Sequence, residues 1–193
     1  MVSQGPKNGN IFANDDTVGT IPWNSPNNAR RSDNDYAYLA ISPNLKSNYL
    51  KATDFGFRIP NGAIINGIRV DVEKMAEYHY WGGLQDNSVK IVKGGTIQGD
   101  DKALTDYWET SDTYVAYGSS TDLWGVAWTA EDINASNFGF VVSAKNVSAE
   151  EYYSEVRIDH IRITIYYEFG LTSCSTLPFG AFPGIPQRRP FTV

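Results

Sequence analysis

The chain has 193 residues, a formal net charge of −6, and a composition that is 41% hydrophobic, 13% aromatic and 20% charged. These values are typical of one globular domain and exclude general disorder. The acidic balance also excludes the broad basic surface that would neutralise phosphates, so we expect no nucleic-acid partner.

The first 16 residues are polar, rich in Gly and Asn, and free of hydrophobic periodicity. Such a segment predicts a flexible N-terminal arm, with the folded domain beginning near Thr17. The segment also lacks the charged start and apolar run of a signal peptide, and no part of the chain approaches the roughly 18 continuous apolar residues of a membrane span. We therefore expect synthesis in a cytoplasm and no membrane partner.

From residue 36 onward, short apolar or alternating runs separated by turn residues predict strands. The clearest case is residues 64–72, where Ile64, Val70 and Val72 share one parity and charged residues take the other, as in a strand with one buried face. Pro-Asn-Gly directly before this strand predicts a turn. The predicted strands are residues 36–41, 48–60, 63–75, 88–93, 113–118, 138–144 and 155–169.

The last of these runs is too irregular for one strict strand. Val156 and Ile158 occupy even positions, whereas Ile161, Ile163 and Tyr167 occupy odd ones. Because side chains alternate between the two faces of a strand, both sets can face inward only if the strand changes register. We therefore expect a β-bulge or bend at the Asp-His pair that follows Ile158.

One segment, WTAEDINAS, predicts a helix of one or two turns. Thr129 can cap it, and Glu131 and Asp132 fall in the first turn, where acidic side chains favour the positive end of the helix dipole. Trp124 and Trp128 nearby are interpreted as plugs of the core or of a sheet end. None of these residues is therefore assigned a reactive role.

Two Phe-Gly-Phe triplets, at residues 55–57 and 138–140, are both predicted to lie in strands. In the second triplet Phe138 and Phe140 alternate inward, and Gly139 on the opposite face permits close approach by a neighbouring backbone or ring. In the first, Phe55 and Phe57 share a parity with Ile59. The repetition favours packing over chemistry.

Many short strands with almost no helix and no alternation of strands with helices predict an all-β fold. The expected architecture is an antiparallel two-sheet β-sandwich, jelly-roll-like, with one short helix and extended terminal arms. The expected division is an arm at residues 1–16, the sandwich at 17–169 and a Pro-rich C-terminal tail at 170–193.

The C-terminal tail carries a net charge of +2, while the rest of the chain carries −8. Pro-rich segments extend readily and lose little entropy on docking, and this one is too apolar for an idle linker. We expect it to dock against its own body or a neighbouring subunit. The candidate docking residues are Leu177, Phe179, Phe182, Ile185, Arg188, Arg189 and Phe191.

Acidic side chains occur close together at two places in the sequence. Asp71 and Glu73 share a strand face about 7 Å apart, a spacing that suits a glycosidase pair, but their setting favours a solvated sheet face. Asp33, Asn34 and Asp35 offer oxygen ligands to calcium without the spaced acidic series of a known loop, so a turn is the favoured interpretation.

The remaining reactive side chains give no catalytic pattern. His79 and His160 are the two histidines, and neither has a second ligand at the spacing of a zinc site. The single cysteine, Cys174, is interpreted as a spectator thiol and excludes an internal disulfide. No nucleophile elbow, phosphate loop or dinucleotide motif is present. We expect no catalytic residue, no metal, no cofactor and no enzymatic activity.

The segment AEYHYWGGLQDN predicts an aromatic loop between two strands. Tyr78, Tyr80 and Trp81 before two glycines can stack on sugar rings or insert into a partner, or fold back over one end of the sandwich. They are the candidate ligand-binding residues, and a glycan is the ligand that they suit.

Four ordered segments carry a resemblance to a known family: IPWNSPNNARRSDNDYAYLA, FGFRIPNGAIINGIRVDVE, DLWGVAWTAEDINASNFGFVV and RIDHIRITIYY. Together they resemble a β-sandwich module of virion structural proteins of tailed bacteriophages, over about residues 17–168. The resemblance implies a virion component made in the host cytoplasm, with other capsid, neck or tail subunits as partners. It also implies a homo-oligomer, for which a trimer is the expected state.

The resemblance brings no catalytic residue, so the first functional hypothesis is a non-enzymatic decoration, cement, neck or tail accessory protein. The alternative is a receptor- or glycan-binding module of a tail or fibre that uses the aromatic loop. A carbohydrate-active enzyme using Asp71 and Glu73 is the third and weakest hypothesis.

Overall fold

The structure is a computed structural model that describes residues 1–77, 83–148 and 154–169. Two long strands, β10 (Ser154–Phe169) and β5 (Ala63–Ala76), form the middle of the fold. β10 pairs antiparallel with β5 along most of its length. The first sheet, sheet A, has the order β1-β10-β5-β8, and β3 also pairs with β10. Its other strands are β1 (Val2–Asn8), β3 (Ala37–Ile41) and β8 (Thr113–Gly118).

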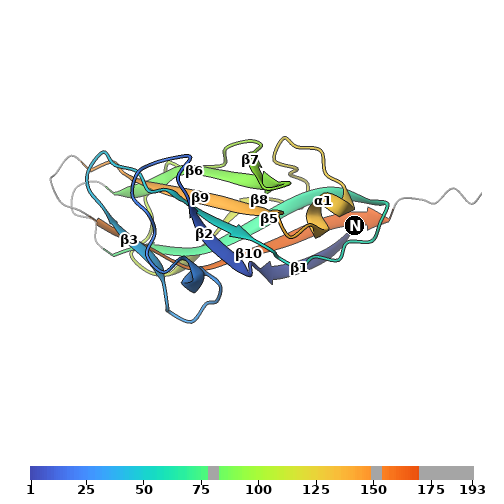
Figure 1. Cartoon of the computed structure of the whole chain (residues 1–193), viewed down its shortest axis with the longest axis horizontal. Coiled ribbons are helices and arrows are strands. Elements are labelled where there is room, and N and C mark those ends of the chain that lie inside the picture. The colour runs from blue at the N-terminus through green and yellow to red at the C-terminus, as the bar shows by residue number, and fades with distance from the viewer. Residues whose placement is uncertain (78–82, 149–153, 170–193) are drawn as a thin grey trace, which may run out of the picture.

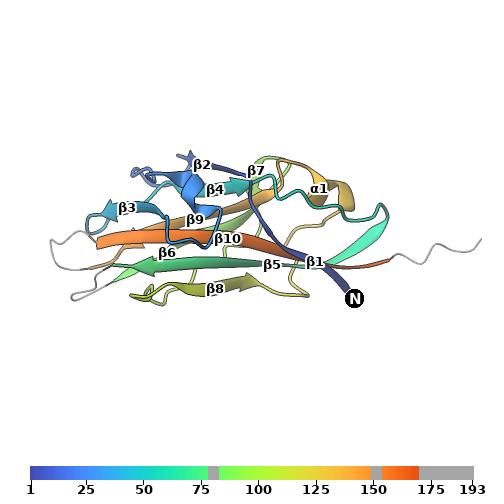
Figure 2. The same ribbon diagram turned by 90° about the horizontal axis from the view of Figure 1, so that it is seen from below.

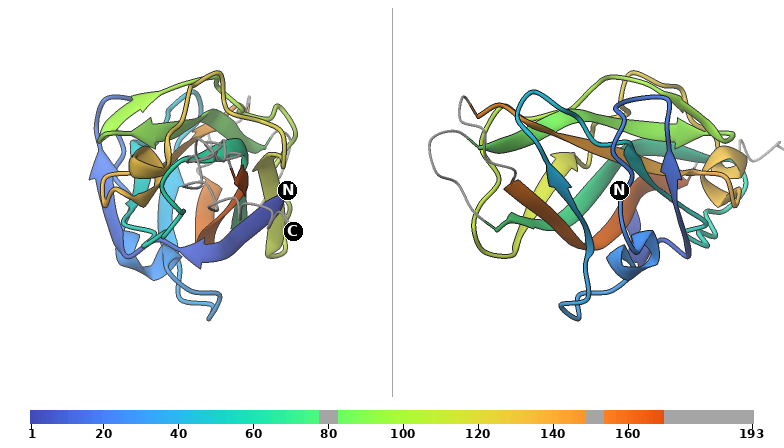
Figure 3. Two further views of the ribbon diagram at one scale, coloured as in Figure 1. Left: turned by 90° about the vertical axis from the view of Figure 1, so that its right-hand side faces the viewer. Right: turned by 60° about the vertical axis from the view of Figure 1, so that its left-hand side comes forward.

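The second sheet, sheet B, lies across sheet A and has the order β2-β4-β9-β6-β7 (Figures 1 and 2). Its strands are β2 (Ile11–Asp15), β4 (Tyr49–Thr53), β6 (Leu84–Lys93), β7 (Thr96–Gln98) and β9 (Gly139–Asn146). Within the described part of the chain each sheet has five strands. The two layers are visible end-on in Figure 3. The expected all-β, jelly-roll-like sandwich is therefore confirmed.

The expected irregularity in β10 is also present. The register with β5 shifts between Ile158 and His160. Val156 and Ile158 before the shift are fully buried, as are Ile161 and Ile163 after it. The bulge thus lets one strand present apolar side chains to the core on both sides of a change in parity.

A second shift in the same pairing, between Tyr166 and Tyr167 of β10, corrects the expected burial of Ile64. Ile65 faces the core, whereas the side chain of Ile64 is 52% exposed. One residue of slip moves a side chain to the other face of the sheet. The expected parity therefore holds in the second half of β5 and fails at its start.

The N-terminal segment is not the expected flexible arm. β1 pairs with the C-terminal half of β10, and β2 pairs with β4, so residues 2–8 and 11–15 are edge strands of the two sheets. Gln4 adds a side-chain hydrogen bond to the Arg58 carbonyl. An edge strand is held by backbone hydrogen bonds to the neighbouring strand, so its sequence need not alternate between apolar and polar residues.

The segment after β4 is buried as expected but is not a strand. Phe55, Phe57 and Ile59 are 2 to 3% exposed, while Asp54 and Gly56 have positive φ angles of 57° and 61° that interrupt an extended ladder. The backbone of Ile59 instead bonds to the side chain of Asn134, which accepts from its N–H at 2.7 Å and donates to its carbonyl at 2.8 Å. The turn expected before β5 is present, closed by the Ala63 N–H and the Pro60 carbonyl.

The predicted helix is α1 (Ala130–Asn134), and Thr129 caps it as expected. The Thr129 hydroxyl accepts the Asp132 N–H, and the Asp132 carboxylate accepts the Thr129 N–H, which completes a capping box. A short 3-10 helix, η1 (Pro26–Ala29), was not predicted. Trp124 is fully buried and Trp128 packs edge-on against Phe138, so the interpretation of both tryptophans as plugs is confirmed.

Gly139 has the tight surroundings expected of it. A Cβ atom at this position would lie 2.0 Å from the Ala52 carbonyl oxygen on the adjacent strand β4. No helix among the described residues has the length and apolar character needed to cross a bilayer.

Candidate functional site

The two sets of residues predicted to bind partners lie outside the described residues. They are the tail residues Leu177, Phe179, Phe182, Ile185, Arg188, Arg189 and Phe191, and the loop residues Tyr78, Tyr80 and Trp81. The last described residue before the tail is Phe169, and those flanking the aromatic loop are Glu77 and Gly83.

β1 begins and β10 ends at the same end of the sandwich (Figure 1), and both strands carry exposed apolar side chains there. The pairing places Val2 opposite Tyr167, and Phe169 opposite Ala63. Phe169 is 62% exposed, Val2 is 42% exposed, and the Phe169 ring packs edge-on against Tyr167 at 5.9 Å. We call Met1, Val2, Ile64 and Phe169, all exposed, the terminal end.

A charged cluster is buried between the two sheets. The Lys74 ammonium on β5 donates to Asp86 Oδ1 on β6 at 2.6 Å and to the Tyr117 hydroxyl on β8 at 2.5 Å. It also lies over the Trp108 ring, 4.3 Å from its centroid. Burial lowers the pKa of Lys74, and the nearby Asp86 carboxylate opposes that shift.

Asp86 is fully satisfied in this cluster. Besides Lys74, it accepts from Trp108 Nε1 at 2.8 Å, the Tyr117 hydroxyl at 2.7 Å and the Leu104 N–H at 3.0 Å. Burial raises the pKa of Tyr117, so its hydroxyl remains a donor. The cluster links sheet A, sheet B and the connection between β7 and β8. The buried charges therefore have a structural role. Sequence reasoning missed it because its members are far apart along the chain.

A hollow of about 220 Å³ lies beside this cluster, lined by Trp108, Tyr107 and Leu104 among others. Tyr107 is 54% exposed, and its ring lies against Gly83, where an added Cβ would be 2.5 Å from a ring carbon. An exposed aromatic ring thus sits next to the chain as it leaves the predicted aromatic loop.

The outer face of sheet A is polar but not freely solvated, which corrects the expectation for Asp71. Its side chain is 9% exposed and pairs with Arg69 at 2.8 Å and Arg162 at 3.5 Å. Glu73 is half-buried, with one carboxylate oxygen buried and without a hydrogen-bond partner among the described residues. The two carboxylates are therefore held in different surroundings, one neutralised by arginines.

The bulge residues of β10 lie beside these carboxylates. His160 is 7% exposed and bonds through Nδ1 to the Tyr114 hydroxyl at 2.8 Å and through Nε2 to Asn8 Oδ1 at 2.9 Å. Burial and the nearby Arg162 lower the pKa of His160, which favours the neutral ring. Both ring nitrogens are thus used within the fold.

Asp159, the other bulge residue, anchors the loop that runs from η1 to β3. Its carboxylate is 1% exposed and accepts the N–H groups of Asp33 at 3.4 Å and Asn34 at 3.2 Å. Burial raises the pKa of Asp159 to about 6, against the effect of these two N–H groups. Residues 33–35, which could offer oxygen ligands to calcium, therefore form a turn that the buried Asp159 carboxylate holds in place.

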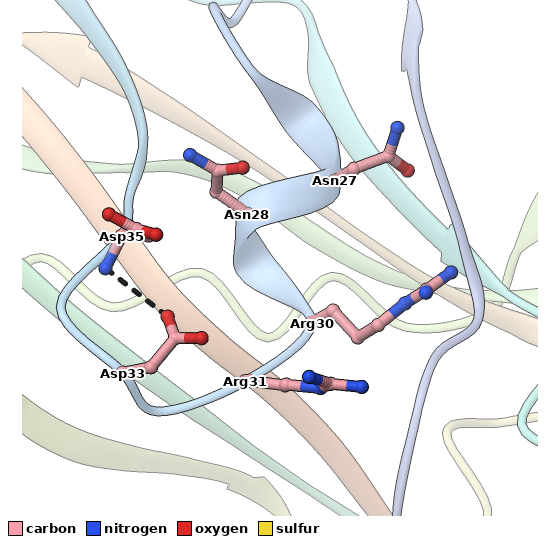
Figure 4. A pocket seen from close by; sticks show the side chains of 6 residues that line it. All are labelled: Asn27, Asn28, Arg30, Arg31, Asp33 and Asp35. Carbon is pink, nitrogen blue, oxygen red and sulfur yellow. Dashed lines mark hydrogen bonds between the residues drawn. The ribbon is translucent and has the colours of Figure 1, made fainter.

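Two open hollows flank this turn. The smaller, about 230 Å³, is lined by Asn27, Asn28, Arg30, Arg31, Asp33 and Asp35 (Figure 4). In it Asp33 Oδ1 accepts the Asp35 N–H at 3.3 Å, and Arg30 and Arg31 point away from these aspartates (Figure 4). Among the described residues, no three His, Cys, Asp or Glu side chains are grouped so as to hold a metal ion.

The larger hollow, about 470 Å³, shares Asn28 and Asp35 with the smaller one. Its other lining residues are Asn34, Tyr36, Tyr38, Glu155 and Arg157, and we call it the tyrosine hollow. Tyr38 is 41% exposed on β3. Tyr36 donates its hydroxyl to Asp112 at 2.6 Å, and this bond raises the pKa of Tyr36 to about 12.

Comparison with known proteins finds only distant structural similarity. No protein-family model and no curated protein sequence matches the chain. One similar solved structure, described as "CBM4 structure and function", is 9% identical with a TM-score of 0.37, over 72% of this chain and 87% of that chain. Another, a crystal structure with a xylogluco-oligosaccharide, is 15% identical with a TM-score of 0.37, over 81% of this chain and 38% of that chain.

Proposed function

We propose that the protein is a non-enzymatic structural component of a tailed-phage virion, a decoration, cement, neck or tail accessory protein. It docks to neighbouring subunits through its C-terminal tail. The proposal rests on the sequence resemblance described above. The observation that supports it best is the terminal end, whose exposed apolar side chains include Phe169, the last described residue before the tail.

The terminal end suits a docking role for a physical reason. Phe169 and Val2 are large apolar side chains left in water at the last and first strands of one sheet. Covering apolar surface gains about 25 cal/mol per Å². A partner that holds the Pro-rich tail is thereby brought against an apolar surface, and tethering raises the effective concentration of the second contact. The tail carries a net charge of +2 and the rest of the chain −8. The tail can therefore bind an acidic surface of a partner, and the rest of the chain a basic surface of the same partner.

The test is incorporation of variants into particles made in cells that supply no wild-type copy. A chain ending at Phe169 should fold, because the described sandwich ends there, and should be absent from purified particles. Val2→Ser should reduce incorporation, whereas Val147→Ser should not, since Val147 is an exposed valine following β9 at the other end of the sandwich. Wild-type incorporation of the shortened chain would sink the proposal.

The alternative, a receptor- or glycan-binding module, rests on Tyr78, Tyr80 and Trp81. The observation in its favour is the exposed Tyr107 ring beside Gly83, which would extend an aromatic surface there. A glycan array with wild type and a Tyr80→Ala, Trp81→Ala double variant tests it. Loss of signal in the double variant with an unchanged thermal unfolding midpoint would support it, and equal signals would contradict it.

A further inference from the structure

We infer that the tyrosine hollow is a binding site for a neutral oligosaccharide. It lies on the outer face of sheet A, beside β3 and the start of β10, and none of its described lining residues belongs to the tail or to the predicted aromatic loop. Its volume of about 470 Å³ falls within the roughly 300 to 1,000 Å³ of sites for small ligands.

The two tyrosines supply flat, rigid contact surfaces. Tyr38 projects from β3 opposite Arg157 of β10, and 41% of its surface is exposed. Tyr36 is fixed by its hydrogen bond to Asp112, and the Arg157 guanidinium lies 5.4 Å from its ring centroid. Aromatic rings present large contact area with few rotatable bonds, so little entropy is lost when a ring-shaped ligand packs on them.

The polar lining consists of planar amide, carboxylate and guanidinium groups, which together offer both donors and acceptors. Asn28 is itself positioned by a 3.3 Å hydrogen bond from its Nδ2 to the Tyr36 carbonyl, and Asn34 Oδ1 lies 3.3 Å from the Tyr36 hydroxyl. Hydroxyl groups both donate and accept, so a sugar ring can satisfy such a mixed lining. A lipid or another wholly apolar ligand would leave the polar groups of this lining without hydrogen-bond partners.

The charges select a neutral sugar over an acidic one. Arg157 forms ion pairs with Glu155 and Glu77, each at 2.7 Å, so its charge is already compensated. Asp35 adds a further carboxylate to the lining. The site is therefore net negative and repels uronic acids, sulfated sugars and nucleic acids.

The backbone around the hollow is held in place before a ligand arrives. Asp159 anchors the N–H groups of Asp33 and Asn34, and Asp33 accepts the Asp35 N–H. On the other side, β3 is paired with β10 through Tyr38 and Arg157. A preorganised site loses less free energy to ordering on binding.

The experiment is a glycan array carrying neutral and uronic-acid oligosaccharides, followed by calorimetric titration of the full chain with the neutral oligosaccharide that gives the strongest signal. Tyr38→Ala should weaken binding at least tenfold, and Asp35→Ala several-fold, with unfolding midpoints near that of wild type because both side chains are exposed. The control is Ile11→Ala, an exposed large side chain on β2 of sheet B and outside the hollow, which should leave the affinity unchanged.

Three outcomes would overturn the inference: no signal on neutral sugars, a preference for acidic sugars, or binding that Tyr38→Ala leaves intact. Failure here is distinguishable from failure of the virion proposal. A chain ending at Phe169 should keep its sugar affinity while losing particle incorporation, and Tyr38→Ala should do the reverse.

Discussion

The Asp86 carboxylate accepts four hydrogen bonds inside the sandwich, and one of the donors is the buried Lys74 ammonium. That ammonium is 4% exposed, and Asp86→Ala leaves it the Tyr117 hydroxyl as its one hydrogen-bond partner among the described residues. Breaking a buried pair from one side costs about 3 to 5 kcal/mol. We predict a loss of this size in the free energy of unfolding, measured by urea denaturation.

Two control variants make that prediction specific. Lys74→Met should cost less than Asp86→Ala, because Asp86 keeps three donors from neutral groups. Lys93→Ala, which breaks the half-exposed pair with Asp132, should cost about 1 kcal/mol or less. Equal costs for all three variants would show that the buried cluster contributes no more than a surface ion pair.

Asp159 predicts an unusual pH dependence of stability. Its pKa is about 6 in the folded protein and near 3.8 in an unfolded chain, so between these values the folded state binds more protons. The stability that this group contributes is fully present below pH 3.8 and is lost as the pH rises through 6. The loss is at most about 3 kcal/mol.

The measurement is the free energy of unfolding from pH 4 to pH 7 for wild type and Asp159→Asn. The variant should lack the part of the decline that lies between pH 4 and about 6, while Asp35→Asn, an exposed neighbour, should behave like wild type. Identical curves for wild type and Asp159→Asn would refute the assignment to this carboxylate.

At the scale of elements, Gly139 lets β9 approach β4 at the α1 end of sheet B. A methyl group there would meet the Ala52 carbonyl oxygen at 2.0 Å and Thr53 Cγ2 at 2.8 Å, so the strands would have to separate. We predict that Gly139→Ala costs at least about 2 kcal/mol by thermal or chemical unfolding.

Gly56→Ala provides the comparison for this glycine. Gly56 has open space around it and a φ of 61°, so alanine there is strained but not crowded, and should cost about 1 kcal/mol. A smaller cost at Gly139 than at Gly56 would mean that the two strands separate easily.

Elements with a pattern of their own were predictable. The parity change around Asp159 predicted the bulge, and Thr129 with two acidic residues predicted α1, because both signals are local. β1 and β2 were missed because edge strands take their pairing from neighbours. The prediction of a strand at residues 55–59 was wrong. The alternation of apolar residues there correctly indicates which side chains are buried, but positive φ angles at Asp54 and Gly56 prevent an extended strand.

The candidate sites were harder to predict than the fold. The tyrosine hollow combines η1, the turn before β3 and the start of β10, which are more than a hundred residues apart at the extremes. Asp33, Asn34 and Asp35 were noticed as possible ligands of calcium, but their actual support is Asp159. Only the folded chain brings these side chains to one surface.

At the scale of the whole molecule, the two proposals assign different work to different regions. In these proposals the terminal end, with Val2 and Phe169, attaches the protein, and the tyrosine hollow beside β3 stays open to solvent. In the figures β3 lies toward the end of the sandwich opposite the N-terminus. An attached copy could thus present the hollow outward.

Hydrogen–deuterium exchange of the protein, free and within purified particles, tests the central claim of attachment through the terminal end most directly. The account predicts slower exchange in particles for β1 (Val2–Asn8) and the last residues of β10, with unchanged exchange at residues 34–38. Slower exchange at residues 34–38 with no change in β1 and β10 would contradict it.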